Sequence, residues 1–278
     1  MIRRIIQHLI IIAIALINIT AIAKPKIITS IVPLASIVAM LMDNQAEISA
    51  IAVTQNCPHH YHIRPSDLQK IKHADIVIYI DDKFDGFIVK IVNNHNKNII
   101  KLSNLPSIKF LTEDNQHNWH FWLNLSNVQA LLEELAIIFV KSFPKLEKNI
   151  LTNLDAAKLQ LNELAQIKAT ALNNLTDVIL LSDSAEHFFI DKYKIYKLYQ
   201  PEYKSLKYMN NLEQLLANSV NKCIIISNEQ NHKLYDKLAA AVIQIDSENW
   251  QLATVNARTF YDQYFRLIQA IMKCTDKY

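Results

Sequence analysis

The chain of 278 residues contains a single glycine, Gly86. A loop that cradles a nucleotide phosphate needs several glycines, because its backbone must come close to the ligand. This scarcity excludes nucleotide binding by a Gly-rich loop. The formal net charge is only +3, and no basic run follows the first residues. The charge pattern therefore gives no indication of a nucleic-acid partner.

Cysteine is also scarce, with only Cys57, Cys223 and Cys274 in the chain. In an oxidising compartment a disulfide can form among them. Cys223 opens an apolar run and Cys274 ends the last helical pattern. A bond between these two would stabilise the fold by about 4 kcal/mol on the chain-entropy estimate. Cys57 would then be left over, either as a small buried side chain or as a soft metal ligand beside His59.

Residues 1–23 have the features of a secretory signal peptide. Arg3 and Arg4 provide the positive start, residues 9–17 form the apolar centre, and an Ala-Ile-Ala sequence supplies small residues for cleavage. The apolar stretch is shorter than the roughly 20 residues of a membrane-spanning helix. We expect cleavage before Lys24, with transient membrane anchoring as the alternative. No cysteine follows the cleavage site, so an acylated lipoprotein of the usual kind is not expected.

Short β-branched runs alternate with helical patterns along the rest of the chain, which is typical of mostly parallel sheets covered by helices. The expected strands are residues 26–32, 48–54, 76–80, 99–102, 178–181, 196–199, 223–227 and 242–245. The expected helices are residues 34–42, 65–74, 84–92, 184–192, 211–219, 231–241 and 258–274. The sequence thus predicts an α/β fold in which each half of the chain builds one sheet.

A long helical pattern separates the two halves. Between residues 144 and 172, apolar residues recur at steps of three and four, which is the period of one helix face. Such a helix would be about 40 Å long. We therefore expect two Rossmann-like α/β lobes, residues 24–143 and 174–278, joined by a rigid linker helix at residues 144–173.

Four residues with metal-binding side chains follow predicted strands or precede predicted helices: His59, His120, Asp183 and Asp246. The carboxyl ends of parallel strands are where open α/β sheets bind ligands. If the lobes face each other, two imidazoles and two carboxylates converge, a set that suits Zn, Mn or Fe(II). Each residue also has an ordinary structural explanation. His59 fits a solvated loop, His120 fits core packing, and the aspartates fit helix caps or turns.

Two sequence blocks support a resemblance to a known family. Pro-His-His-Tyr at residues 58–61, Arg-Pro-Ser-Asp at 64–67 and Ala-Asp at 74–75 form one block, and His-Phe-Trp-Leu-Asn at 120–124 forms the other. They resemble the P-H-x-Y…R-P-S-D…A-D and H-x-W-L-[NS] blocks of the ZnuA-like solute-binding proteins of zinc and manganese ABC importers. The resemblance covers essentially the whole mature chain.

The resemblance implies a specific ligand set. His59 and His120 match the first and second ligands, and Asp246 matches the fourth. An ungapped alignment of the third block places its ligand on Asp183, whereas a slip of one residue would place it on Ser182. The implied cargo is a divalent metal ion held by these side chains.

The same resemblance implies a disulfide between Cys223 and Cys274, where zinc-type members have theirs. The chain also departs from the family in two places. The His- and acid-rich loop before the second ligand is reduced to residues 113–118. Glycines of the third block are replaced by Ser184 and Lys194, so a backbone with positive φ would be strained there or would differ.

The function implied is that of a non-catalytic periplasmic carrier, which captures a divalent metal and delivers it to an ABC permease at the inner membrane. Zinc is the first choice, because of the implied disulfide and the Arg-Pro-Ser-Asp block. Manganese or iron is the alternative, because two carboxylates suit harder ions. The carrier is expected to be a monomer that binds no nucleic acid.

Two interpretations compete with a carrier. A metallohydrolase would need a general base, but the chain has no H-E-x-x-H sequence. The one candidate base, Glu186, is expected on a solvated helix face. A degenerate or adhesin-like relative that transports no metal is suggested by Asp183 and by the missing glycines.

Overall fold

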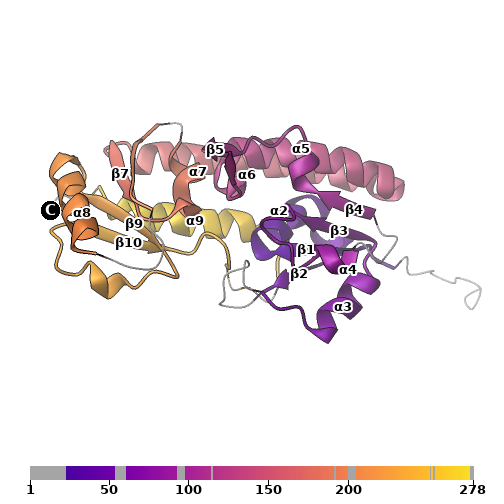
Figure 1. Cartoon of the computed structure of the whole chain (residues 1–278). Coiled ribbons are helices and arrows are strands. Elements are labelled where there is room, and N and C mark those ends of the chain that lie inside the picture. Colours follow the sequence, from indigo (N-terminus) through magenta and orange to yellow (C-terminus); the bar gives the residue numbers. More distant parts are fainter. Residues whose placement is uncertain are drawn as a thin grey trace, which may run out of the picture.

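The structure, a computed structural model, describes residues 23–53, 61–92, 98–113, 115–190, 192–199, 205–250, 252 and 254–275. Two sheets lie toward opposite ends of an elongated molecule, and long helices run along it (Figure 1). Both of these sheets are parallel and are covered by helices, so the predicted α/β class with two lobes is confirmed. The residue boundaries expected for the lobes stay a prediction.

The first sheet has the strand order β2-β1-β3-β4, and every pair in it is parallel. Its strands are β1 (Lys26–Ile31), β2 (Glu47–Ala52), β3 (Ile76–Tyr79) and β4 (Asn98–Lys101). Its accompanying helices are α2 (Val32–Met42), α3 (Pro65–Lys72) and α4 (Val89–Val92). Ile27 of β1 pairs with Ile48 on one side and Ile76 on the other. β-branched side chains fit such a pleated surface, and β3 is buried at every position.

The second sheet has the order β10-β9-β7-β8 and is also parallel. Its strands are β7 (Asp177–Leu180), β8 (Lys194–Lys197), β9 (Cys223–Ser227) and β10 (Ala241–Ile245). The helices of this half are α7 (Glu186–Phe189), α8 (Leu206–Asn218) and α9 (Thr259–Met272). Each expected strand therefore forms, with ends shifted by no more than a few residues.

The helix expected at residues 231–241 is wrong. The structure has only the short 3-10 helix η7 (His232–Leu234) there. Of the segment's large apolar side chains, Tyr235 is buried and Leu234 is half exposed. Because short helices depend on packing an apolar face, this segment has too little buried surface to hold one. The helix expected at residues 184–192 is likewise shorter, as η6 (Asp183–Ala185) followed by α7.

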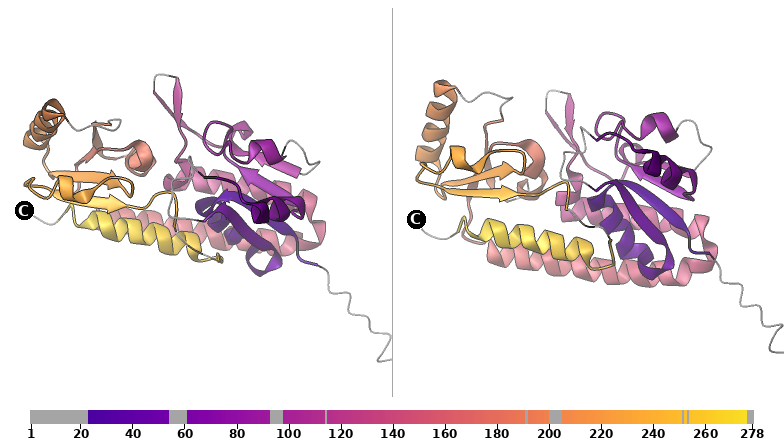
Figure 2. Two further views of the ribbon diagram at one scale, coloured as in Figure 1. Left: turned by 60° about the horizontal axis from the view of Figure 1, so that its bottom comes forward. Right: turned by 90° about the horizontal axis from the view of Figure 1, so that it is seen from below.

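The predicted connecting helix is present as α6 (Glu147–Ala171), which follows α5 (Leu125–Ser142). Its 25 residues correspond to about 38 Å. The buried face of α6 consists of Ile150, Ala157, Leu161 and Leu164. It contacts α2 and α5 of the first half, and α9 lies alongside it (Figure 2). Because α9 also contacts α2, two helices rather than one connect the halves.

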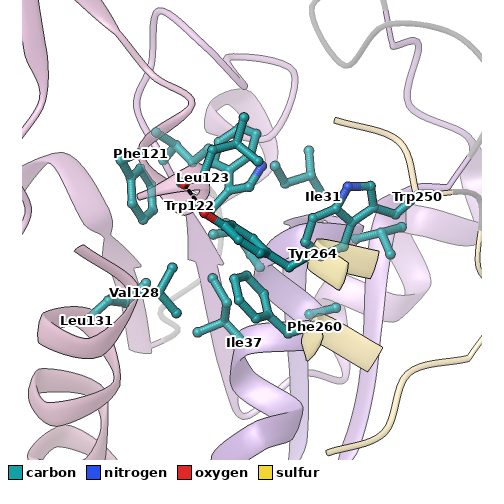
Figure 3. Close-up of a cluster of buried hydrophobic side chains, with 14 of the residues drawn as sticks. Ile31, Ile37, Phe121, Trp122, Leu123, Val128, Leu131, Trp250, Phe260 and Tyr264 are labelled. Carbon is teal, nitrogen blue, oxygen red and sulfur yellow. Dashed lines mark hydrogen bonds between the residues drawn. The ribbon is translucent and has the colours of Figure 1, made fainter. Parts of the chain in front are cut away.

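The apolar core is continuous where the two halves meet (Figure 3). Trp122 comes from the first half, and Trp250 and Tyr264 come from the second. The Tyr264 hydroxyl donates to the carbonyl oxygen of Leu123 at 2.9 Å, and the Trp122 ring N–H donates to that of Ser247 at 2.8 Å. These bonds satisfy the polar tips of buried aromatics, and they also tie the halves together.

A hairpin that the sequence did not reveal joins the first half to the second. Its antiparallel strands are β5 (Leu111–Glu113) and β6 (Gln116–Asn118). At its turn Asn115 has φ 60°, which asparagine tolerates better than most residues. From β8, Lys197 reaches the hairpin and pairs with the carboxylate of Glu113 at 2.6 Å. The described residues of the shortened family loop therefore belong to a hairpin that contacts the second half.

The predicted disulfide between Cys223 and Cys274 is confirmed, with 5.3 Å between the Cα atoms. Cys57 lies outside the described residues. Neither Ser184 nor Lys194 has a positive φ, so the backbone at these replaced glycines is unstrained. Within the described part of the chain, no helix is both long and apolar enough to cross a membrane.

Candidate metal centre

Three of the four predicted ligands line one cavity of about 160 Å³: His120, Asp183 and Asp246. His59 lies outside the described residues. The described residues include no group of three or more His, Cys, Asp or Glu side chains placed to hold a metal ion. The three predicted ligands thus share a cavity without forming a closed cluster.

His120 is buried at the start of η4 (Phe121–Leu123), with only 4 % of its surface exposed. Its ring packs edge-on against Phe84, with 5.8 Å between the centroids. The Nδ1 atom lies 2.9 Å from Oδ1 of Asn118, and Nε2 lies 2.7 Å from Oε1 of Glu248. The ordinary explanation for His120, core packing, is therefore correct. In addition, the Nε2 atom of His120 faces Glu248, which lines the same cavity.

The tautomer of His120 follows from Asn118. The side-chain nitrogen of Asn118 donates to the carbonyl oxygen of Asp183 at 2.9 Å and to Oε2 of Glu186 at 3.1 Å. Its side-chain oxygen is therefore the atom that faces His120, and it accepts from both the backbone N–H and Nδ1–H. With the hydrogen on Nδ1, Nε2 is the nitrogen available to a metal.

The charges around the ring favour its protonated form. Burial acts to lower the pKa of His120. The hydrogen bond and charge of Glu248, together with the charges of Asp183 and Glu186, outweigh burial and raise that pKa above its ordinary value. A proton therefore competes with a metal ion for Nε2.

Asp183 lies three residues after the end of β7, at the start of η6, and the residue is exposed. The sequence offered helix capping as its ordinary role, but the structure assigns that role to Ser182, whose hydroxyl accepts from the N–H of Ser184 at 3.2 Å. Among the described residues, no hydrogen bond is made to the carboxylate of Asp183. This carboxylate is thus placed at the cavity without a capping duty.

Asp246 does perform the turn-capping role that was its ordinary explanation. Its carboxylate accepts the backbone N–H groups of Glu248, Asn249 and Trp250 at 3.3, 2.9 and 3.0 Å. Burial raises the pKa of Asp246, although these three N–H groups act in the opposite direction. A carboxylate offers about four lone-pair sites, so capping still leaves one for a metal ion.

Glu186 corrects an expectation. It is not on a solvated helix face but buried, with 8 % of its surface exposed. Its two oxygens are bound by Lys197 at 2.5 Å and by Asn118 at 3.1 Å. Two oxygens held in this way connect the hairpin and β8 to α7, and they make Glu186 a poor general base for a hydrolase.

Sequence reasoning missed Asn118 and Glu248. Each lies two residues from a predicted ligand, Asn118 before His120 and Glu248 after Asp246. That spacing is the one available signal, and it is weak. Only the packing of the halves makes these residues neighbours of the imidazole.

The described part of the first sequence block, from Tyr61 onward, is bonded to the start of α3. The Tyr61 hydroxyl donates to Oδ2 of Asp67 at 2.7 Å, and the backbone N–H of Arg64 donates to the same oxygen at 3.0 Å. The Tyr61 ring packs against Phe87, with 5.2 Å between centroids. The chain two residues after His59 is thereby fastened to the first turn of α3.

Comparisons with known proteins support the family resemblance seen in the two sequence blocks. The chain is 46 % identical over 260 residues to an uncharacterized protein of Rickettsia prowazekii, RP014, covering 92 % of this chain and 86 % of the relative. It is 25 % identical over 189 residues to the high-affinity zinc uptake protein ZnuA of Haemophilus ducreyi, covering 56 % and 61 %. Further matches include streptococcal proteins named for iron.

Solved structures agree on the fold. The periplasmic zinc-binding protein TroA of Treponema pallidum superposes with a TM-score of 0.77 at 15 % identity, covering 92 % of this chain and all of TroA. The profile of the family described as zinc-uptake complex component A, periplasmic, matches residues 27–274. This match, which spans most of the chain, shows that the chain belongs to the ZnuA family, as its two sequence blocks had indicated.

Proposed function

We propose that this protein captures a divalent transition metal, zinc first, in the periplasm and delivers it to an ABC permease for uptake. The observation that carries the proposal is the setting of His120. Its ring is buried and oriented by Asn118, and Nε2 faces a cavity that is also lined by Asp183 and Asp246. Export would use residues 1–23, with cleavage before Lys24.

Membership of the family makes the protein a binding component of a metal-uptake system and not an enzyme. This agrees with the prediction from sequence, which favoured a carrier over a metallohydrolase. The buried, doubly bound carboxylate of Glu186 adds a physical argument in the same direction. The permease partner and the monomeric state remain parts of the proposal.

Metal capture would be coordination without turnover. His120 would donate its Nε2 lone pair, Asp183 and Asp246 would donate carboxylate oxygens, and His59 would complete a set of two nitrogens and two oxygens. Such a set suits Zn²⁺, which accepts imidazole and carboxylate ligands in a tetrahedral arrangement. Because a protonated imidazole cannot bind a metal, the proton at His120 must leave on capture.

Manganese or iron is the alternative cargo, because the two carboxylates suit harder ions and iron-named proteins are among the relatives. The divalent stability order favours zinc over both ions at almost any such site. Affinity alone therefore does not identify the metal carried in the cell. The cargoes can be distinguished by growing the native cells with all three metals present and isolating the protein from their periplasm. The metal bound to the isolated protein then identifies the cargo.

The test is zinc titration of the metal-stripped protein, residues 24–278, against a calibrated chelator. We expect one tight site in the wild type, weakened at least about tenfold in Asp183→Ala. The matched control is Asp155→Ala, an exposed aspartate on α6 that should leave the affinity unchanged. No tight binding by the wild type would contradict the carrier and favour a degenerate relative. Equal affinity in Asp183→Ala would move the third ligand to Ser182, Cys57 or water.

A further inference from the structure

The loop that follows β10 places a second carboxylate beside the predicted metal site. Oε1 of Glu248 lies 2.7 Å from Nε2 of His120, and the two side chains are only 16 % and 5 % exposed. Glu248 lines the same cavity as Asp183 and Asp246. This carboxylate is thus in contact with the nitrogen that a metal ion would use.

The loop holds Glu248 in this position from two sides. Asp246 accepts its backbone N–H at 3.3 Å and that of Asn249 at 2.9 Å. On the other side, the carbonyl oxygen of Ser247 accepts from the ring of Trp122 in the first half. Since the backbone on both sides is bonded, the main chain at Glu248 is held in place, and its carboxylate is directed to His120.

The distance between the two atoms is close to the separation of two ligand atoms on one metal ion. The contact of 2.7 Å between the imidazole nitrogen and the carboxylate oxygen has the length of a hydrogen bond. A tetrahedral zinc ion, with ligand bonds of about 2.0–2.2 Å, would hold such a nitrogen and oxygen about 3.4 Å apart. The Glu248 oxygen would need to retreat by only about 0.7 Å, which a small side-chain rotation supplies.

We propose that Glu248 is a ligand of the captured metal ion, an inference that rests on the proposed function. Glu248 would then join His120, Asp183 and Asp246, which line the same cavity. Because these described side chains do not form a closed cluster, they would have to move closer together around the ion. The alternative role is that of a place-holder, in which Glu248 only hydrogen-bonds to Nε2 of His120 in the metal-free protein and does not bind the metal. The two roles predict opposite effects of removing the carboxylate.

The experiment is zinc titration of the metal-stripped protein with Glu248→Gln, which keeps the size of the side chain and removes its charge. The matched control is Glu229→Gln, an exposed carboxylate at the rim of the same cavity, because it removes the same charge. We expect Glu248→Gln to weaken zinc binding at least about tenfold more than Glu229→Gln does. Circular dichroism and thermal unfolding check that each variant folds.

Each outcome decides the point. Unchanged or tighter binding in Glu248→Gln would overturn the proposal and leave a place-holder. An equal loss of zinc affinity in both variants would show that only the removed negative charge matters. That result would also overturn the proposal. If the wild type itself binds no zinc, the proposed function fails rather than this inference. Should Glu248→Gln not fold, a structure of the zinc-loaded wild type decides, with a Glu248 oxygen expected within about 2.2 Å of the ion.

Discussion

At the scale of single residues, Asn118 holds two histidines in opposite electrostatic settings. Its side-chain oxygen accepts from His120, and its backbone carbonyl oxygen accepts from Nε2 of His187 at 3.1 Å. Glu248 raises the pKa of His120, as described above. Burial, helped by the nearby charge of His120, lowers the pKa of His187 to about 4. Neighbouring imidazoles therefore differ in which protonation state they favour.

The low pKa of His187 should make stability depend on pH. Below its ordinary pKa of 6.5, the unfolded chain binds a proton that the folded protein accepts only near pH 4. The stability that neutral His187 contributes is therefore complete above pH 6.5. It is lost as the pH falls from 6.5 toward the folded pKa of about 4. Between about pH 7 and pH 5 the loss should be about 2 kcal/mol.

Urea unfolding of the metal-stripped protein at the two pH values measures this loss. His187→Gln can still donate to the carbonyl of Asn118 but does not titrate. We expect its stability to fall about 2 kcal/mol less than that of the wild type over the same interval. The exposed His73→Gln is the matched control and should retain the wild-type loss. Identical losses in all three proteins would rule out a depressed pKa at His187.

At the scale of elements, the local sequence pattern predicted the strands of the two parallel sheets. It did not predict the hairpin β5–β6 or the absence of a long helix at residues 231–241. Runs such as Ile76–Tyr79 are β-branched and buried throughout, so neighbouring residues contain enough information to identify them. The hairpin β5–β6 is held partly by Lys197, which lies far along the chain from Glu113. The segment 231–241 has helical spacing but too little surface to pack. Elements that depend on a distant partner were the ones missed.

The disulfide joins two elements whose pairing was implied by resemblance, the start of β9 and the end of α9. It closes a loop with a sequence separation of 51 residues. The chain-entropy estimate for this length is about 4 kcal/mol. We expect the double variant Cys223→Ala/Cys274→Ala to lose about this much free energy of unfolding, as measured by denaturant titration.

The reducing agent supplies a matched comparison for that variant. Reduced wild type should approach the stability of the double variant, because both lack the cross-link. Adding reductant to the double variant should change nothing. A loss below about 1 kcal/mol would show that the unfolded chain is already restricted without the bond, contrary to the entropy estimate.

At the scale of the whole molecule, the halves are connected in several independent ways. Both α6 and α9 contact α2, and the aromatic core runs between the halves without a break. Polar bonds reinforce this packing, from Trp122 to Ser247 and from Asn118 to Glu186. Large hinge motions need a few free connecting residues, and continuous packing of this kind resists them.

Metal binding should therefore change the overall shape little. We expect small-angle X-ray scattering to give the same radius of gyration, within error, for metal-stripped and zinc-loaded protein. Magnesium, which avoids imidazole ligands, serves as the control for added salt. A clear contraction on adding zinc alone would contradict the rigid connection.

The sequence by itself determined the strands, the long helix, the family blocks and the cysteines available for pairing. These properties are carried by neighbouring residues or by motif spacing, so they survive without knowledge of the packing. The tertiary structure alone decided which carboxylate meets which imidazole. Glu248 contacts His120 across 128 residues of sequence, and Asn118 reaches Glu186 across 68. Such contacts depend on how two separately formed sheets pack together, and local spacing does not encode that arrangement.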